Sequence, residues 1–361
     1  MKLFESPVVK NSPVPAHQQV RDKLLALIKS GELPPNGKLP SEPQIAEWLG
    51  VSRMTANKAI LALVSEGWVS REKGRGTYVC SPPATIQRCA IAMVPTHIPG
   101  VMEDYYFGSI YWNMQALLSE HSLPIEIVRL DSTISEHIGP GTGLIAINPP
   151  QSIVPALAEL RSSGVPVVLV GATWQDWDID SVDSDNFLGP ALAVNHLAEL
   201  GHRRVLFVGS NPGDSNTQDR LRGFRIAMKA RQLDVAPEDE FMARGYTFDD
   251  DAVETILERV RDEATAVFAA GPRLAIQMLV AAQREGLSVP QRLSIVGYDD
   301  PSYLSYTHPA MTTVKQPLAD MAKVAFKLVW EGSSDARRPV KRHLLDPQLI
   351  VRGSTGPPCR G

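Results

Sequence analysis

The stretch Gly50–Ile60 reads GVSRMTANKAI and has the pattern of a helix that begins just after a tight turn. Apolar residues recur at helical spacing from Ala56 onward, so one face of this helix is expected to be buried. Gly50 is typical of the turn that ends a preceding helix, predicted over residues 42–49, and Ser52 is typical of an N-cap. The sequence therefore predicts two helices joined by a tight turn, which is the helix-turn-helix arrangement.

The periodicity of the chain changes after Gly67. Residues 68–72 and 75–79 read as two short strands on either side of a turn that contains glycine. A hairpin that follows a helix-turn-helix forms the wing of a winged helix. A first helix is predicted over residues 15–30, and the polar, proline-punctuated residues 1–14 are expected to form a flexible arm.

Basic and polar residues stand where a winged helix would meet DNA. Arg53 lies at the start of the second helix, and its guanidinium can grip a guanine edge through two hydrogen bonds. Lys38 and Arg75 are expected to meet phosphates, which position a protein without reading sequence. Surface helices also carry basic residues for solubility alone, but the wing and the helix-turn-helix together favour DNA binding. The residues expected at DNA are Lys38, Ser41, Ser52, Arg53, Thr55, Asn57, Lys58, Arg75 and Gly76.

The segment His17–Val79 resembles the GntR-type winged-helix DNA-binding domain. The motifs that carry the resemblance are IKSGEL (28–33), KLPSE (38–42), VSRMT (51–55), AILAL (59–63) and EG (66–67). The sequence departs from the pattern at Pro43, where many members have a polar or basic residue, and at Asn57, where many have arginine. A DNA contact from position 43 is therefore doubtful, whereas Asn57 can still read an adenine edge.

Charge is distributed unevenly along the 361 residues. Residues 1–84 contain 11 Lys and Arg against 7 Asp and Glu, and the remaining 277 residues contain 25 against 33. Phosphate neutralisation needs local positive charge, so a basic head joined to an acidic body fits a nucleic-acid module attached to a part that does not touch DNA. The length predicts two or three domains.

From residue 88 onward, short apolar runs alternate with amphipathic helices. The expected strands are residues 89–94, 125–130, 144–148, 165–171, 205–209, 266–269 and 293–298, and the expected helices are residues 110–120, 153–163, 188–200, 221–231, 250–261 and 274–285. Fully apolar strands are typical of parallel sheets that are covered by helices on both faces. The fold class is therefore α/β, and about 270 residues are enough for two Rossmann-like lobes with a cleft between them.

Residues 88–352 resemble the effector-binding domains of LacI-type regulators. The motifs that carry the resemblance are VDSDN (182–186), AVNHLAELGHRRV (193–205), RLRGF (220–224), GLSVP (286–290), SIVGYDD (294–300) and HPAMTTV (308–314). Those domains are similar to periplasmic sugar-binding proteins, and their two lobes close on a small molecule. Joined to a GntR-type head, this body resembles the hybrid architecture of arabinose-type repressors.

The expected domain organisation follows from the two resemblances. It consists of a winged helix over residues 15–80, a short proline-stiffened linker over 81–87, an effector-binding and dimerisation domain over 88–352, and a tail over 353–361.

The LacI-type resemblance also implies an effector site. It places Arg220 in the cleft, where the guanidinium would hold hydroxyls or a carboxylate, with an ion pair between the lobes as the alternative. Aromatic rings at strand exits stack on ligands but also serve as core, and Asp185 is equally typical of a turn. The residues implied at the effector are Tyr106, Phe107, Trp174, Asp185, Arg220, Arg273 and Asp299.

The stretch AAGPRLA over residues 269–275 departs from the LacI-type pattern. Many members have Asn-Asp before this helix, and the aspartate accepts hydrogen bonds from sugar hydroxyls. Pro272 has no side-chain acceptor, so a sugar derivative that is anionic or phosphorylated is considered beside a free sugar. Arg273 would then join Arg220 at the ligand, and a solvent-facing Arg273 is the alternative.

The three cysteines, Cys80, Cys89 and Cys359, form no Cys-x-x-Cys pair, which indicates reduced thiols and no zinc site. The N-terminus has no signal-peptide pattern, and no apolar run approaches the roughly 20 residues that a membrane span needs. A cytoplasmic protein without cofactor, metal or membrane partner is expected.

The expected function is a ligand-responsive transcription regulator, a repressor, that binds a pseudo-palindromic operator as a homodimer. A small-molecule enzyme is one alternative, but the sequence lacks the phosphate-loop, dinucleotide, Gly-x-Ser-x-Gly and His-Glu-x-x-His patterns. A solute-binding transport component is the other, but it would require a secretion signal and would have no use for a winged helix.

Overall fold

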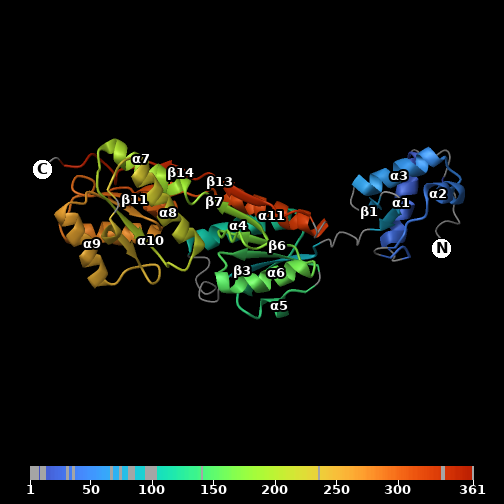
Figure 1. Cartoon of the computed structure of the whole chain (residues 1–361), viewed down its shortest axis with the longest axis horizontal. Helices are drawn as coiled ribbons and strands as arrows, with labels where there is room; N and C mark the ends of the chain where they lie inside the picture. Colours follow the sequence, from blue (N-terminus) through green and yellow to red (C-terminus); the bar gives the residue numbers. More distant parts are fainter. Residues whose placement is uncertain are drawn as a thin grey trace. The chain divides into compact units, whose positions relative to one another are not determined.

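The computed structural model describes residues 8, 14–29, 32–34, 37–65, 68–72, 75–79, 86–93, 104–139, 141–234, 236–334 and 338–359. The chain divides into two compact units, residues 1–87 with 330–338 and residues 88–329 with 339–361. Figure 1 labels many of the elements of the two units. The predicted arm and linker lie almost wholly outside the described residues.

The first unit contains the winged helix. Its elements are α1 (Ala16–Lys29), α2 (Glu42–Leu49), α3 (Arg53–Ser65), β1 (Val69–Glu72) and β2 (Gly76–Val79). Gly50 ends α2 with a φ of 64°, and its amide donates to the carbonyls of Ala46 and Glu47. Glycine adopts this left-handed conformation without strain, so the predicted turn between the two helices is confirmed.

The core of the winged helix is formed by one face of each helix and the inner side of the hairpin. Leu24 of α1, Leu49 of α2 and Ile60 of α3 are fully buried in one cluster. Val69 and Val79 belong to the same cluster and face each other directly in the antiparallel hairpin. The wing is therefore packed on the helices through its side chains, and the stripe predicted for α3 is buried.

The second unit contains two lobes, each built on a six-stranded sheet. The first lobe comprises β3 (Arg88–Met93), α4 (Tyr105–Glu120), β4 (Ile125–Arg129), α5 (Ile134–His137), β5 (Thr142–Ile147), η3 (Gln151–Ile153), α6 (Val154–Ser162), β6 (Val167–Val170), β7 (Asp180–Ser184), α11 (Leu318–Ser334) and β13 (Arg342–Leu345). Its strand order is β13-β7-β6-β5-β3-β4, and every neighbouring pair is parallel. Helix α11 lies beside the end of α4, where Phe326 stacks on His121.

The second lobe repeats this plan. It comprises α7 (Leu188–Leu200), β8 (Val205–Gly209), α8 (Ser215–Ala230), η4 (Pro237–Asp239), β9 (Glu240–Met242), α9 (Asp250–Asp262), β10 (Ala266–Ala269), α10 (Pro272–Arg284), β11 (Ser294–Tyr298), η5 (Ser302–Ser305), β12 (Thr312–Lys315) and β14 (Gln348–Ile350). Its strand order is β14-β12-β11-β10-β8-β9, with only the β12–β14 pair antiparallel among these strands. The α/β fold class with a winged helix in front of it is confirmed.

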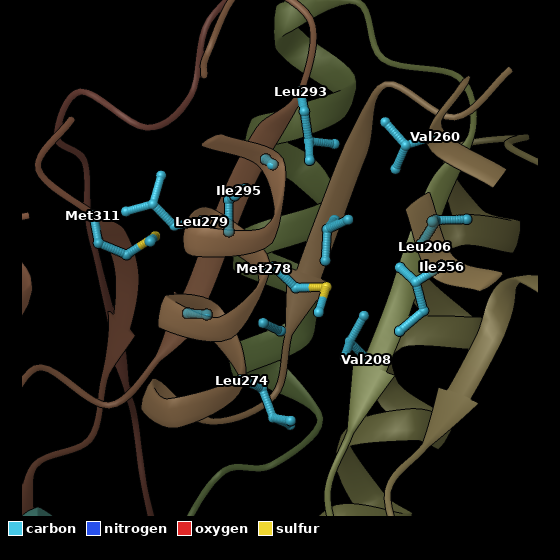
Figure 2. Close-up of a cluster of buried hydrophobic side chains, with 14 of the residues drawn as sticks. Leu206, Val208, Ile256, Val260, Leu274, Met278, Leu279, Leu293, Ile295 and Met311 are labelled. Atoms are coloured by element: carbon cyan, nitrogen blue, oxygen red, sulfur yellow. The ribbon is translucent and has the colours of Figure 1, made fainter. Parts of the chain in front are cut away.

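Strands β8 and β10 show why helices cover both faces of the sheet. Alternate residues of a strand point to opposite faces, and all residues of these two strands are buried. Leu206 and Val267 join the cluster beneath α9 and α10, whereas Phe207 and Phe268 join the cluster beneath α7 and α8. Figure 2 shows the first of these clusters, to which β8, α9, β10, α10 and β11 contribute.

Within the described residues from 104 onward, the chain passes between the lobes three times. The crossings lie between β7 and α7, between β12 and α11, and between β13 and β14. The last crossing consists of residues 346–347. As a result, the C-terminal segment completes an edge of both sheets.

The structure differs from the sequence-based expectations at several elements. The sequence did not predict β7, because it reads DSVDS, and its polar residues are nevertheless buried. The short edge strands β9, β13 and β14, together with β12 and α11, were also not predicted. Helix α8 begins at Ser215, six residues before the predicted start, because its first turns are polar and carry no apolar stripe.

A close approach between α8 and the first crossing generates a stability prediction. A Cβ added at Gly223 would stand 2.8 Å from the Cα of Phe187, whereas a Cβ at Gly245 would meet nothing within 4 Å. We expect Gly223→Ala to lower the free energy of unfolding of the second unit by about 1–3 kcal/mol, because backbone atoms must shift. The matched control Gly245→Ala should stay within about 0.5 kcal/mol of wild type in urea unfolding. Equal effects of the two variants would contradict this packing.

Candidate functional site

Helix α3 presents a polar row on the surface of the winged helix. Arg53 and Lys58 are exposed, Asn57 is half-buried, and Ala56 between them is buried in the core. Arg53 and Asn57 are four residues apart, so they lie one above the other on the same side of the helix. Side chains in this row can reach base edges when the start of the helix enters a major groove.

Three of the hydroxyl groups predicted at DNA form hydrogen bonds at the starts of α2 and α3. The Oγ of Ser52 accepts a hydrogen bond from the amide of Thr55 at 3.1 Å, and the two hydroxyl oxygens lie 2.8 Å apart. The amide and the Oγ of Ser41 both donate to Oε1 of Gln44, at 2.9 and 2.8 Å. These bonds satisfy polar groups at the starts of α2 and α3. The three residues therefore fix where both helices begin.

The predicted phosphate contacts gather at the hairpin. Lys38 forms a β-bridge with Tyr78, and a Cβ added at Gly76 would stand 2.8 Å from the Cε of Lys38. Arg75 precedes Gly76 at the start of β2, and its carbonyl accepts a hydrogen bond from the Tyr78 hydroxyl at 3.3 Å. Two basic residues thus stand beside Gly76, and the side chain of Lys38 packs over the glycine backbone.

A cavity lies between the two lobes of the second unit, beyond the carboxyl ends of its parallel strands. Open α/β sheets bind their ligands at this edge. The lining residues are Asp104–Phe107, Asn148, Ser210, Asp214, Asn216, Thr217, Arg220, Tyr246, Ala270–Leu274, Asp299, Tyr303 and Gln316. The predicted effector residues Tyr106, Phe107, Arg220, Arg273 and Asp299 are among them.

Arg220 of α8 is a buried cation in this cavity, with an exposed fraction of 6%. Its Nε donates to Oδ1 of Asn186 at 2.9 Å, and its Nη1 donates to the carbonyl of Ala270 at 3.0 Å. Its guanidinium also lies 3.8 Å from the centroid of the Tyr298 ring. No carboxylate of the described residues lies within ion-pair distance of Arg220, so an interlobe salt bridge does not account for its position.

Arg273 of α10 reaches toward the first lobe. Its Nη2 lies 3.6 Å from Oδ2 of Asp104, and its guanidinium lies 5.6 Å from the centroid of the Tyr246 ring. Asp104 caps α4, because its Oδ1 accepts hydrogen bonds from the amides of Tyr106 and Phe107. One carboxylate therefore both offsets the charge of Arg273 and holds the start of the helix that carries the two rings.

Two protein-family models match the chain. The model of bacterial regulatory proteins of the gntR family matches residues 16–79, and the model of the periplasmic binding protein-like domain matches residues 194–355. The chain joins a GntR-type DNA-binding domain to a periplasmic-binding-protein-like domain. Both resemblances indicated by the sequence motifs are confirmed.

Several proteins that are similar to this chain are transcription regulators. The arabinose metabolism transcriptional repressor of Geobacillus stearothermophilus is 29% identical over 96% of this chain and 99% of that protein. A LacI family transcriptional regulator from Mycobacterium smegmatis is 25% identical, with a TM-score of 0.65 over 75% of this chain and 99% of its own. The complex of the transcriptional regulator CelR with cellobiose has the same fold, with 22% identity and a TM-score of 0.67 over 88% of this chain and 100% of that chain.

Buried carboxyl groups surround Arg220 in the periplasmic-binding-protein-like domain. Burial raises the pKa of Asp183 to about 7, and the nearby charge of Arg220 opposes this rise. Burial also raises the pKa of Asp299 and of Asp214, again against the effect of Arg220. Asp183 accepts a hydrogen bond from Nδ2 of Asn186 at 3.0 Å, and Asn186 in turn accepts from Arg220. The protonation state of Asp183 in β7 is therefore linked, through Asn186, to Arg220 in the cavity.

Two of the residues expected at the effector, Trp174 and Asp185, do not line this cavity. Trp174 packs against the core of the first lobe, and its Nε1 donates to the carbonyl of Pro149 at 3.0 Å. Asp185 accepts hydrogen bonds from the amides of Phe187 and Leu188 at 2.9 and 2.8 Å. The ring thus serves as core, and the carboxylate caps the start of α7, which is the turn-forming alternative.

The sequence analysis missed several polar residues of the cavity. Asn148 and Ser210 directly follow β5 and β8, and Gln316 directly follows β12. For the first two, the position at the end of or directly after a predicted strand was a usable signal, because ligands meet parallel sheets at the carboxyl ends of strands. Gln316 donates to Oδ1 of Asp299 at 2.7 Å, and no signal pointed to it because β12 itself was not predicted.

The described residues contain no group of three or more His, Cys, Asp and Glu side chains placed to hold a metal ion. A helix long and apolar enough to cross a bilayer is also absent from the described part of the chain.

The raised pKa of Asp183 generates a pH prediction. A carboxyl group with a higher pKa in the folded than in the unfolded state holds its proton more tightly when folded, so its contribution to stability is lost as pH rises from about 4 through about 7. We expect Asp183→Asn to flatten this pH dependence, because asparagine does not ionise. Its NH₂ group cannot accept one of the two hydrogen bonds that the Asp183 oxygens accept, so the variant should be less stable than wild type at pH 5 by about 1 kcal/mol. Thermal unfolding between pH 5 and 8 measures it, with the exposed Asp176→Asn as control. A wild-type slope retained in Asp183→Asn would contradict the assignment.

Proposed function

We propose that this protein is a ligand-responsive transcriptional repressor. The observation that carries the proposal is the union, in one chain, of a GntR-type winged helix and a two-lobed domain with a polar cavity that holds a buried arginine. A relative that aligns along 96% of the chain is a repressor of arabinose metabolism. No catalytic step is assigned to the cavity, and the protein acts in the cytoplasm, where its operator is.

In this proposal the winged helix binds operator DNA through two kinds of contact. The row on α3, with Arg53 and Asn57, reads base edges in the major groove. Lys38, Arg75 and the backbone at Gly76 bind phosphates beside it. Two copies of the chain related by a two-fold axis bind the two halves of a pseudo-palindromic operator.

The effector that fits the cavity best is a neutral polyhydroxylated molecule, a sugar. The cavity contains the carboxyl groups of Asp104, Asp214 and Asp299 against the guanidinium groups of Arg220 and Arg273. An anionic ligand would meet this excess of carboxyl groups, and the charge of Arg273 is already offset by Asp104. Sugar hydroxyls donate to carboxylates and accept from guanidinium groups. Asp104 and Asp214 thus offer the acceptors that Pro272 lacks.

Effector binding regulates DNA binding by favouring one arrangement of the two lobes. An effector changes operator affinity only by as much as it distinguishes two states of the domain, so the coupling is a few kcal/mol and is reciprocal. The predicted linker over residues 81–87 connects the two domains and contains Pro82 and Pro83. A stiff connection of this kind transmits lobe closure to the spacing of two DNA-binding domains.

The DNA contacts generate a prediction about two arginines. Arg53→Ala should relax base preference at one position of each half-site and cost about 1–3 kcal/mol of binding free energy, because it removes a base contact. Arg75→Ala should weaken binding to all sequences alike. It should also lower the slope of log affinity against log salt concentration by about 1. Selection from randomised duplexes, followed by titrations at several salt concentrations, measures both. The wild-type selection should return two inverted half-sites at fixed spacing.

An outcome in which Arg53→Ala keeps full affinity and unchanged preference would contradict the placement of α3 in the major groove. A wild-type preference for a single asymmetric half-site, together with a monomer at micromolar concentration in sedimentation, would contradict the homodimer.

The cavity generates a prediction about the effector response. L-Arabinose, D-ribose, cellobiose and D-ribose 5-phosphate are titrated by calorimetry, and a neutral sugar is expected to bind more tightly than the phosphate. Arg220→Lys should weaken the binding of that sugar by roughly 10-fold or more, because a lysine cannot reproduce the planar set of N–H donors of a guanidinium. Operator affinity without sugar should stay unchanged. Arg222→Ala is the matched control, since Arg222 lies on the same helix but is exposed and does not line the cavity. Tighter binding of the phosphate, or a normal response of Arg220→Lys, would contradict the assignment.

A further inference from the structure

A network of three side chains joins the wing to both helices of the helix-turn-helix. Arg71 in β1 forms an ion pair with Glu42, the first residue of α2. The same Nη2 atom of Arg71 donates to Oδ1 of Asn57 on α3 at 2.8 Å. The side chains of Arg71 and Glu42 are 41% and 36% exposed, so the network lies at the surface of the domain and not in its core.

The guanidinium decides which way the carboxamide of Asn57 faces. Arginine has five N–H donors and no acceptor, so the carbonyl oxygen of the carboxamide, and not its NH₂ group, must face Arg71. The oxygen of Asn57 is therefore directed to the wing, and the NH₂ group is directed away from it. An unrestrained asparagine offers an acceptor and a donor side by side, which is the pair that matches N6 and N7 of adenine.

We propose that Arg71 is a positioning residue that sets the base preference of Asn57. With its oxygen turned toward Arg71, Asn57 points its NH₂ donors at the major groove. This orientation favours a base edge whose acceptors have no donor beside them, either N7 and O6 of guanine or O4 of thymine. This replaces the adenine contact that the sequence suggested for Asn57. Glu42 holds Arg71 in place by its opposite charge and keeps the guanidinium from a phosphate. The inference rests on the proposed role of the winged helix in operator binding.

The energetics of the network separate specificity from stability. Exposed ion pairs contribute about 0–1 kcal/mol to folding, so removing Arg71 should leave the domain folded. The hydrogen-bonding pattern that Asn57 shows to DNA changes completely, however, because the freed carboxamide can turn. A change of base preference with little change in stability is therefore the signature of this network.

The test uses the full-length protein and duplexes randomised across the half-site. Asn57→Ala first identifies the base pair that Asn57 reads, as the position where preference is lost. Wild type should select guanine or thymine there, and Arg71→Ala should shift that position toward adenine by roughly 5- to 10-fold, with other positions unchanged. The double variant Arg71→Ala/Asn57→Ala should match Asn57→Ala at that position, because Arg71 acts through Asn57.

Two further variants keep the test decisive. Glu42→Gln should shift the base preference at the same position toward adenine by a smaller factor. If Arg71→Ala melts well below wild type, Glu42→Gln replaces it as the test of the network. Arg75→Ala, in the turn just before β2 and outside the network, should weaken binding to all sequences without shifting the preference at that position.

Three results would overturn the proposal. The first is a wild-type preference for adenine at the Asn57 position. The second is a uniform loss of affinity in Arg71→Ala with a salt slope lower by about 1, which would make Arg71 a phosphate contact. The third is a shift in base preference in Arg71→Ala that also appears when the double variant Arg71→Ala/Asn57→Ala is compared with Asn57→Ala. A wild-type protein that selects no sequence at all would instead contradict the DNA-binding function itself, and the inference with it.

Discussion

The burial of one guanidinium is the constraint on which the cleft depends. Taking an ionised group out of water costs several kcal/mol unless hydrogen bonds and opposite charge compensate. Arg220 obtains these from the amide oxygen of Asn186, the carbonyl of Ala270 and the ring of Tyr298, with the carboxyl of Asp183 nearby. These groups come from the first crossing and from the ends of β10, β11 and β7. The floor of the cavity is therefore fixed by several elements at once.

The contacts that join the two lobes across the cavity are longer and more exposed than those of Arg220. Arg273 and Asp104 stand 3.6 Å apart with partly exposed side chains, and the amide of Asn216 lies 3.5 Å from that of Asn148. Long, solvated contacts of this type contribute about 1 kcal/mol or less. The cavity thus combines a firmly held arginine, Arg220, with weak contacts between the two lobes. A domain that responds to a ligand needs both. The ligand then replaces contacts that cost little to break, while the group that recognises it stays in place.

The sequence predicted those parts of the fold whose residues follow a helical or strand pattern or end a helix. The stripe on α3, the glycine turn at Gly50 and the apolar strands such as β8 and β10 follow from local chemistry alone. It failed at β7, because a strand buried through Asp180 and Asp183 has no apolar signal, and at the edge strands β13 and β14, whose pairing is decided by partners far away in the chain. In the cavity, Arg220 was accessible through its motif. Asp104 was not, because its contact with Arg273 arises from the meeting of two lobes, and Gln316 was not, because β12 before it was not predicted.

The order of strands has a consequence for the synthesis of the protein. The winged helix is a contiguous segment that ends before residue 88, so a ribosome completes it before it reaches the periplasmic-binding-protein-like domain. Each sheet of the periplasmic-binding-protein-like domain, by contrast, receives an edge strand from residues 342–350, beside β7 in one lobe and β12 in the other. A chain that stops short of residue 342 would have a complete DNA-binding domain joined to two sheets with uncovered edges, which are the surfaces that recruit other strands and aggregate. Strands β13 and β14 thus cover sheet edges that would otherwise be open to pairing with other strands.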